Sequence, residues 1–388
     1  MNPPAASGRS PEALAWFGGQ LATGLMQVSD DPGVLDRSGR WAVVIDFEGT
    51  VTLARFRSWI PTAAADLPGH WRGADPASWR SSLNRDDYCR AVEEIRDAIG
   101  RGDVYQANLC RVMHAQLPDP SRRHPLGLAR LLAKGNPAPH LGALQLPGDS
   151  ASAYGLRRPT GVNVVCASPE LYLSRQRDDV VSRPIKGTAT SAESMLAKDE
   201  AENVMIVDLV RNDLGAIAAT GSVSVPEFLN VEEHPGLVHL VSGVRAKLRA
   251  DVGWPELLAA TFPPGSVTGA PKSSALTIID RLEPTPRGPY CGAIGWVDAD
   301  SGMAELAVGI RTFWIDDGGD DRGPYDGGPA TIRFGTGAGI TWGSDAAGEW
   351  RETELKAAHL IAVAAGESDP RVGLSPVGRG RLEDGGTA

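Results

Sequence analysis

The chain has 388 residues, of which 42% are hydrophobic and 22% are charged, so its composition is that of a globular protein and excludes a wholly disordered chain. The formal net charge of -10 argues against nucleic acid and anionic membrane surfaces as partners, because both attract a basic face. The four cysteines form no C-x-x-C pair, which argues against zinc-knuckle and disulfide frameworks and favours a reducing, cytoplasmic compartment.

The N-terminus has no apolar signal-peptide core, and no stretch of 18 consecutive apolar residues occurs, so we expect neither export nor a membrane-spanning helix.

The first predicted element is a β-hairpin over residues 41–56, where two β-like runs flank Glu48-Gly49. A helix is predicted to begin after Asn84, a suitable N-cap, and to end at Gly100 and Gly102. Its apolar residues recur at helical spacing, namely Tyr88, Val92, Ile95 and Ile99.

A strand is predicted directly after this helix, at residues 104–113, and shorter strands at 162–167 and 171–174. A second helix is predicted over 199–212, and the Gly/Asp/Pro run at 316–329 reads as a long hairpin loop. Strand pairs separated by helices predict an α+β fold. The first ten residues and the tail after Gly366 lack apolar periodicity and are expected to be disordered.

Three blocks of sequence stand out: residues 101–112 (RGDVYQANLCRV), residues 168–213 with RPIKGTATS and KDEAENVMIVDLVRND, and residues 262–356 with FPPGSVTGAPK, AVGIRTFW and EWRETELK. In this order they resemble the chorismate-utilising enzymes, a family that includes anthranilate synthase component I, aminodeoxychorismate synthase component I and the isochorismate and salicylate synthases. The resemblance covers residues 84 to 362. It implies one large domain in which two antiparallel sheets face each other, flanked by helices, with the substrate between them.

The resemblance also implies a division of the chain. Residues 1–83 would be a short N-terminal segment integrated into the sheet core, residues 84–365 the chorismate-binding catalytic region, and residues 366–388 a disordered tail. The N-terminal segment is short for the family, and the motif that forms the tryptophan inhibitor site of anthranilate synthases is not found in it. We therefore expect no feedback inhibition by tryptophan.

Two acidic pairs have the i, i+3 spacing that places side chains on one helix face: Asp199 with Glu202, and Glu349 with Glu352, which Lys356 follows on the same face. On spacing alone, a solvated helix face is the simplest interpretation. Two such helices meeting would form an oxygen-rich site suited to Mg²⁺. The resemblance implies this second interpretation, with Glu202 and Glu352 as direct Mg²⁺ ligands and Asp199 and Glu349 acting through water.

The resemblance implies a set of substrate contacts. Arg311 would pair with the enolpyruvyl carboxylate, Tyr290 and Lys356 would add donors, and the backbone N–H groups of Gly337 and Gly339 would approach a carboxylate. Three further positions match substrate-lining residues of the family: Gln106, Thr188 and Ser266. Lys272 could equally be a substrate contact or a structural residue.

Glu170, in SPE, matches the family acid that protonates the departing C4 hydroxyl, and a carboxyl buried among apolar residues can hold its proton at neutral pH. An exposed loop glutamate is the alternative. His239 matches the family histidine near the ring, but a lone histidine is equally compatible with a satisfied core residue.

Two positions bear on the reaction. Water-adding members of the family carry a lysine base where this chain has Gln106, and glutamine cannot deprotonate water. Lys186 stands in Pro-Ile-Lys-Gly-Thr, which resembles aminodeoxychorismate synthase component I, whereas anthranilate synthases have alanine there. The resemblance implies that Lys186 attacks C2 and that ammonia then enters at C4. The chain has only six lysines against 32 arginines, which favours a need for the amine itself.

Departures from the family pattern keep alternatives open. Residues 189–191 (ATS) replace the arginine that commonly follows PIKGT, and the linker to Lys198 and Asp199 is shorter than usual. Anthranilate synthase component I is the nearest alternative, and a non-catalytic chorismate-binding paralogue is another. No Gly-x-Cys-x-Gly nucleophile motif occurs, so ammonia would come from a separate glutaminase subunit or from free ammonium.

Overall fold

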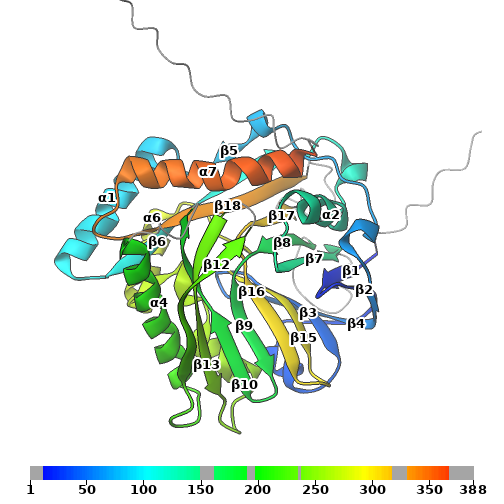
Figure 1. The fold of residues 1–388 in the computed structure, drawn as a ribbon. Helices are drawn as coiled ribbons and strands as arrows, with labels where there is room; N and C mark the ends of the chain where they lie inside the picture. Colours follow the sequence, from blue (N-terminus) through cyan, green and yellow to red (C-terminus); the bar gives the residue numbers. More distant parts are fainter. Residues whose placement is uncertain (1–11, 149–160, 190–196, 235–236, 317–329, 367–388) are drawn as a thin grey trace, which may run out of the picture.

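The computed structural model describes residues 12–148, 161–189, 197–234, 237–316 and 330–366. The predictions for the first ten residues, for the loop after Asp316 and for the tail after Gly366 fall outside these ranges. Every pairing among the described strands is antiparallel, and helices cover the outer faces of the sheet (Figure 1). The predicted α+β fold is confirmed.

The strands follow one continuous series of pairings that folds into two facing layers. The first layer contains, in spatial order, β5 (Arg80–Ser81) and β14 (Gly269–Ala270) at the edge, then β6 (Gln106–Gln116), β18 (Thr331–Ile340), β17 (Thr312–Asp316), β8 (Val162–Ser168), β7 (His140–Leu146) and β1 (Leu14–Phe17). The second layer contains β2 (Gln20–Ser29), β4 (Val51–Pro61), β3 (Arg40–Ile45), β15 (Ala293–Asp298), β16 (Met303–Val308), β9 (Leu171–Gln176), β10 (Asp179–Arg183) and β13 (Leu237–Lys247), with β11 (Ile185–Ala189) and β12 (Ser224–His234) paired to β13.

The two facing layers are halves of one hydrogen-bonded sheet, because β1 pairs with β7 on one side and with β2 on the other. Their inner faces share one apolar core. In β8, for example, Val164 and Cys166 pack into this core together with Leu306 and Val308 of β16. Successive strand residues alternate between the two faces, so Val165 of β8 points to a second core under the outer helices.

Helices cover the sheet in three places. Figure 1 shows α2 and α7 over the outer face of the first layer, while α1 and α6 pack beside β6 and α4 lies against β13. Their bounds are α1 (Arg85–Arg101), α2 (Pro125–Gly135), α4 (Ala197–Gly215), α5 (Trp254–Thr261), α6 (Lys272–Leu282) and α7 (Ala346–Ala365). Short 3-10 helices lie at η1 (Pro32–Asp36), η2 (Ala64–Asp66), η3 (Pro76–Ser78), η4 (Pro120–Arg122) and η6 (Gly265–Val267).

Local sequence signals explain several of these boundaries. The Asn84 side chain accepts a hydrogen bond from Asp87 N at 2.9 Å, and Gly102 ends α1 with a left-handed φ of 83°. The hairpin predicted around Glu48-Gly49 is formed by β3 and β4, with Gly49 at φ 85°. Among the described helices, none is both long enough and apolar enough to cross a membrane.

Candidate active site

Glu170 lies in the turn between β8 and β9 and is only 4% exposed. Its backbone N–H donates to Ser168 Oγ at 3.1 Å, which fixes the turn. Burial raises the pKa of the Glu170 carboxyl to about 7, although a hydrogen bond with Ser266 and the charge of Lys186 both act in the opposite direction. A carboxyl with this pKa holds a proton in a large fraction of molecules at neutral pH, so it can act as an acid.

Lys186 projects from β11 into the same cluster. Its amino group is crowded by protein atoms, and this burial lowers the pKa of the amine. The carboxylates of Glu202 and Glu170 oppose that shift, whereas the charge of Lys356 reinforces it. A lysine in this environment carries a larger fraction of uncharged amine than a solvated one, which is the form that can attack carbon.

Helices α4 and α7 bring acidic side chains toward Lys186. Glu202 of α4 and Glu352 of α7 both act electrostatically on its amine. Glu352 also pairs with Lys356, Oε1 to Nζ at 2.6 Å, and both of these side chains are about half exposed. Glu349, one turn earlier, is buried. Glu202 and Glu352, one from each predicted acidic pair, therefore both lie near Lys186.

The site contains hard oxygen donors of the kind that Mg²⁺ prefers. The side chain of Asp199, the fourth predicted ligand, lies outside the described part of the chain. Among the described side chains, no three His, Cys, Asp or Glu groups are close enough together to hold a metal ion. The Mg²⁺ site thus stays a prediction, supported by the donor chemistry and by the shared influence of Glu202 and Glu352 on Lys186.

Gly337 and Gly339 lie on β18, opposite Cys110 and Asn108 of β6. Lys356 Nζ donates to the carbonyl oxygen of Gly337 at 3.1 Å, so the α7 lysine also reaches this strand. A Cβ atom at Gly337 would lie 2.6 Å from Cys110 Sγ. The glycines therefore allow β18 and the β6 side chains to pack closely, a role that the sequence did not indicate.

Tyr290 lies between α6 and β15, and Arg311 lies between β16 and β17. The Tyr290 ring packs on Gly335, where a Cβ atom would lie 2.0 Å from the ring, and its hydroxyl lies 4.0 Å from Cys110 Sγ. Arg311 adopts a left-handed φ of 52° directly before β17. Burial lowers the pKa of its guanidinium, and no carboxylate among the described residues offsets this effect. A partly buried guanidinium in this state suits an anionic ligand.

Three other predicted residues occupy the second layer or the loop that faces it. His239 is buried on β13. Its backbone pairs with that of Thr188 on β11. The side chain of Thr188 lies outside the described part of the structure. Ser266 is buried in η6 and hydrogen-bonds to the Glu170 carboxyl. Gln106, a fourth predicted residue, lies on β6 of the first layer and is also buried.

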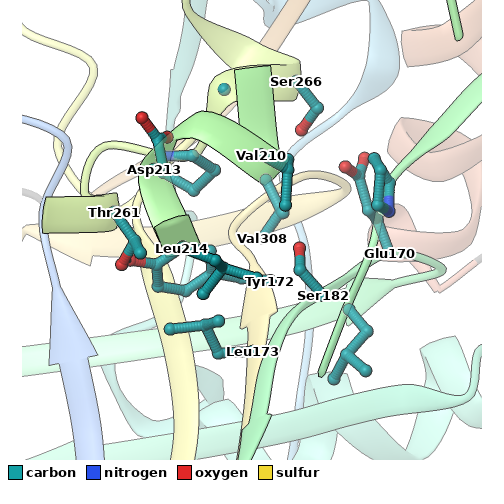
Figure 2. Close-up of a pocket in the computed structure, with 14 residues that line it drawn as sticks. Glu170, Tyr172, Leu173, Ser182, Val210, Asp213, Leu214, Thr261, Ser266 and Val308 are labelled. Atoms are coloured by element: carbon teal, nitrogen blue, oxygen red, sulfur yellow. The ribbon is translucent and has the colours of Figure 1, made fainter. Parts of the chain in front are cut away.

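A small cavity lies directly behind Glu170. Figure 2 shows Glu170 and Ser266 at one part of it and Asp213 and Thr261 at another, with apolar side chains such as Val210 between them. Its volume of about 20 Å³ matches one water-sized molecule. At its far end Lys272 Nζ donates to Asp213 Oδ2 at 2.7 Å, so Lys272 ties α6 to α4, in agreement with its structural interpretation.

Sequence reasoning missed a buried ion pair that holds the site loops together. Arg287 pairs with Glu283, NH2 to Oε1 at 2.6 Å, with both side chains almost fully buried. The same guanidinium donates to the carbonyl oxygens of Val267, beside Ser266, at 2.8 Å and of Asn108 at 3.0 Å. The only local signal was the i, i+4 spacing of Glu283 and Arg287.

Comparisons with known proteins agree with this picture. A family model described as chorismate binding enzyme matches residues 52–362. Anthranilate synthase component 1 of Neisseria meningitidis is 35% identical over 296 residues, which cover 73% of this chain and 54% of that protein. An aminodeoxychorismate synthase of Streptomyces pristinaespiralis is 36% identical over 372 residues, 89% of this chain and 47% of that protein. The chain spans about half the length of these relatives.

Two solved structures share the fold. Anthranilate synthase component I from Streptococcus pneumoniae aligns with a TM-score of 0.64 at 25% identity, covering 88% of this chain and 80% of that one. The menaquinone-specific isochorismate synthase from Escherichia coli aligns with a TM-score of 0.70 at 17% identity, covering 91% and 88%. The second likeness concerns the fold alone.

Proposed function

The chain belongs to the chorismate-binding enzyme family, and we propose that it is component I of an aminodeoxychorismate synthase, which replaces the C4 hydroxyl of chorismate by an amine. One observation carries this choice within the family. A lysine with a lowered pKa, Lys186, lies beside an acid, Glu170, whose pKa is raised to about 7. Together they supply a nucleophile and a proton donor at neutral pH.

The first half of the proposed reaction uses both groups. The uncharged amine of Lys186 attacks C2 of chorismate, the two ring double bonds move from C1–C2 and C5–C6 to C1–C6 and C4–C5, and the C4–O bond breaks. Glu170 gives its proton to the departing hydroxyl, which leaves as water, and Glu170 becomes a carboxylate. The intermediate is held covalently through the lysine nitrogen, so water and ammonia are kept away from C2.

The second half restores the enzyme. Ammonia attacks C4, the two double bonds move back to C5–C6 and C1–C2, and the C2–N bond breaks with its electron pair returning to Lys186. The new C4 ammonium group then gives one proton to the Glu170 carboxylate. The net change is chorismate plus ammonia to aminodeoxychorismate plus water, and both side chains return to their starting protonation states.

Substrate binding is assigned to cationic and small residues around this pair. Arg311 would hold the enolpyruvyl carboxylate, since its guanidinium is partly buried without an offsetting carboxylate among the described residues. Tyr290, Ser266, Thr188 and His239 would line the ring. Lys356 and the backbone of Gly337 and Gly339 would receive the ring carboxylate.

Mg²⁺ would be held by Glu202 and Glu352, with Asp199 and Glu349 acting through water, and it would supply positive charge at the ring carboxylate. Replacing Glu202 or Glu352 by glutamine should therefore abolish turnover while the unfolding temperature stays close to that of the wild type. Turnover near the wild-type rate with an unchanged Mg²⁺ titration would refute this assignment.

Ammonia would come from a glutaminase subunit, or from free ammonium in its absence. We test the proposed function with the purified chain, Mg²⁺, chorismate and ammonium salt, and mass spectrometry of the product. Aminodeoxychorismate should form with ammonium, and glutamine alone should support no turnover. Glutamine-dependent turnover by the isolated chain would contradict the need for a partner.

Anthranilate synthase component I is the second candidate, because relatives of that name match at similar identity. That activity would place the amine at C2 and release pyruvate. Anthranilate fluorescence in the same assay, without any added lyase, would establish it in place of the C4 reaction.

A further inference from the structure

A buried side chain on α4 fixes this helix against the second layer of the sheet. Asn203 is 1% exposed, and its amide Nδ2 donates to the carbonyl oxygen of Leu240 on β13 at 3.0 Å. Its Oδ1 accepts a hydrogen bond from Ser242 Oγ, also on β13, at 2.6 Å. Both ends of one amide are therefore bonded to the same strand, so a shift of α4 along β13 would break both hydrogen bonds.

Ser242 connects this amide to two further segments. The residue is completely buried, and its backbone N–H donates to the carbonyl oxygen of Pro184 at 3.2 Å. Pro184 stands two residues before Lys186 in the sequence. The Ser242 hydroxyl also accepts a hydrogen bond from the backbone N–H of Leu229 on β12 at 3.0 Å. One serine thus joins helix α4, strand β12 and the segment that leads to Lys186.

Strand β12 is irregular where it meets this serine. Its register with β13 shifts between Glu227 and Asn230, and Leu229 in this interval has a left-handed φ of 54°. A non-glycine residue in this conformation is strained, and it persists only where its surroundings hold it. The Ser242 hydroxyl supplies a partner for the Leu229 N–H and is itself bonded to Asn203. The same hydroxyl therefore stabilises both the bulge and the helix contact.

Asn203 is the residue after Glu202 on α4. Successive residues of an α-helix point about 100° apart, so fixing the Asn203 amide on β13 also fixes the direction in which the Glu202 side chain leaves the helix. Helix α4 packs against β11 as well as β13, and the Glu202 carboxylate acts on the Lys186 amine. The network therefore holds the helix that carries Glu202 against the segment that carries Lys186.

Resting on the proposed function, we propose that Asn203 and Ser242 are a positioning pair for the two charged groups on α4 and β11. They set Glu202 and Lys186 in the relative placement that Mg²⁺ binding and attack on chorismate require. In this role neither Asn203 nor Ser242 contacts the substrate. A displacement of about 1 Å between reacting groups can lower a rate about a hundredfold, so a contact outside the chemistry can control it.

The first test separates kcat from KM. Ser242→Ala removes the shared hydroxyl with the smallest change in shape, and Asn203→Leu removes both amide contacts. At saturating Mg²⁺ and ammonium, kcat should fall about tenfold or more in each variant. The KM for chorismate should stay within about threefold, because Arg311 and Gly337, which are assigned to its carboxylates, lie on other elements.

A second readout does not depend on turnover. Groups that orient a metal ligand typically contribute about ten- to a hundredfold to metal affinity, so the Kd for Mg²⁺ should rise about tenfold in both variants. Calorimetric titration of chorismate-free protein measures this Kd. Gln145→Leu is the matched control, because Gln145 is a buried amide of β7 that donates to the carbonyl oxygen of Glu12 at 2.9 Å. It should leave kcat and the Kd for Mg²⁺ unchanged.

Ser242→Ala carries the test alone if Asn203→Leu does not fold, since it removes only one oxygen atom. Unchanged kcat and Kd for Mg²⁺ in a folded variant would overturn the inference. So would an equal loss of kcat in Gln145→Leu, or a loss of kcat/KM that came entirely from the KM for chorismate. Absence of any aminated product from the wild type, or of Mg²⁺ binding by it, would instead overturn the proposed function.

Discussion

Lys272 and Lys186 both lie near carboxylates, and their surroundings differ in kind. Lys272 donates to Asp213 Oδ2 at 2.7 Å and to Thr261 O at 3.1 Å, and both charged side chains are mostly buried. Lys186 is shared between Glu202 and Glu170, is opposed by Lys356, and has a pKa lowered by burial. A lysine that forms a direct, buried ion pair with one carboxylate stabilises the structure. A buried lysine that lies near several carboxylates has more uncharged amine, which is the form that can react.

The largest expected effect comes from Lys186→Arg, which keeps the charge and removes the nucleophile. Formation of aminodeoxychorismate should fall by about a thousandfold or more. Lys272→Arg is the matched control, because arginine can keep the pair with Asp213, and it should stay within about tenfold of the wild-type rate. Product is measured by mass spectrometry under saturating ammonium. Equal losses in both variants would erase the distinction between the two lysines.

Glu170→Gln should lower the rate by roughly a hundredfold to ten-thousandfold, since it removes the proton donor. The wild-type rate should fall as pH rises through about 7, because burial raises the pKa of Glu170 to about 7 and the protonated form is the active one. On the acidic side the rate should rise with pH as Lys186 loses its proton. Glu170→Gln should lose the descending limb of the profile. A descending limb that persists in this variant would assign it to another group.

Replacing each lysine by methionine sharpens the comparison through stability. Lys272→Met leaves the mostly buried Asp213 without its partner, so the free energy of unfolding should fall by about 3 kcal/mol. Lys186→Met removes an amine whose charged form is disfavoured by burial, so its loss should be much smaller. Urea unfolding followed by tryptophan fluorescence measures both. A larger loss for Lys186→Met would show that Lys186 is the structural lysine.

The smallest effect concerns Lys356. Its positive charge helps to lower the pKa of Lys186, so Lys356→Met should raise that pKa and move the ascending limb of the rate profile to higher pH. Because Lys356 is about half exposed, solvent screening should keep this shift small. Glu354→Gln on the same helix is the control, because Glu354 pairs with Arg111 instead. A shift to lower pH after Lys356→Met would contradict the assigned influence.

The fold could be predicted where its signals are local. Asn84 and Gly102 mark the ends of α1 because a cap and a left-handed glycine act within one turn. The pairing of β1 with β7 joins Ala15 to Leu144, and neither residue differs in type from many others that could pair. The family resemblance implied two facing antiparallel sheets, and the long-range register of their strands was not predicted.

In the site, too, only the features with local sequence signals could be predicted. Motifs pointed to Glu170 and Lys186, but the balance of burial and charge around them depends on α4, α7 and η6, which are far apart in sequence. The contact of Asn108 Nδ2 with the carbonyl oxygen of Ser266 could not be predicted, because the two residues are 158 positions apart in sequence.

Strand β1 has one more consequence. The strand pairs with β2 on one side and with β7 on the other, so it joins the two halves of the sheet. A chain lacking Leu14–Phe17 would present two unpaired strand edges, one on β2 and one on β7, each with free backbone donors and acceptors. Such edges recruit strands from other molecules. Trimming the N-terminus past Phe17 should therefore cause self-association before it affects any residue of the proposed site.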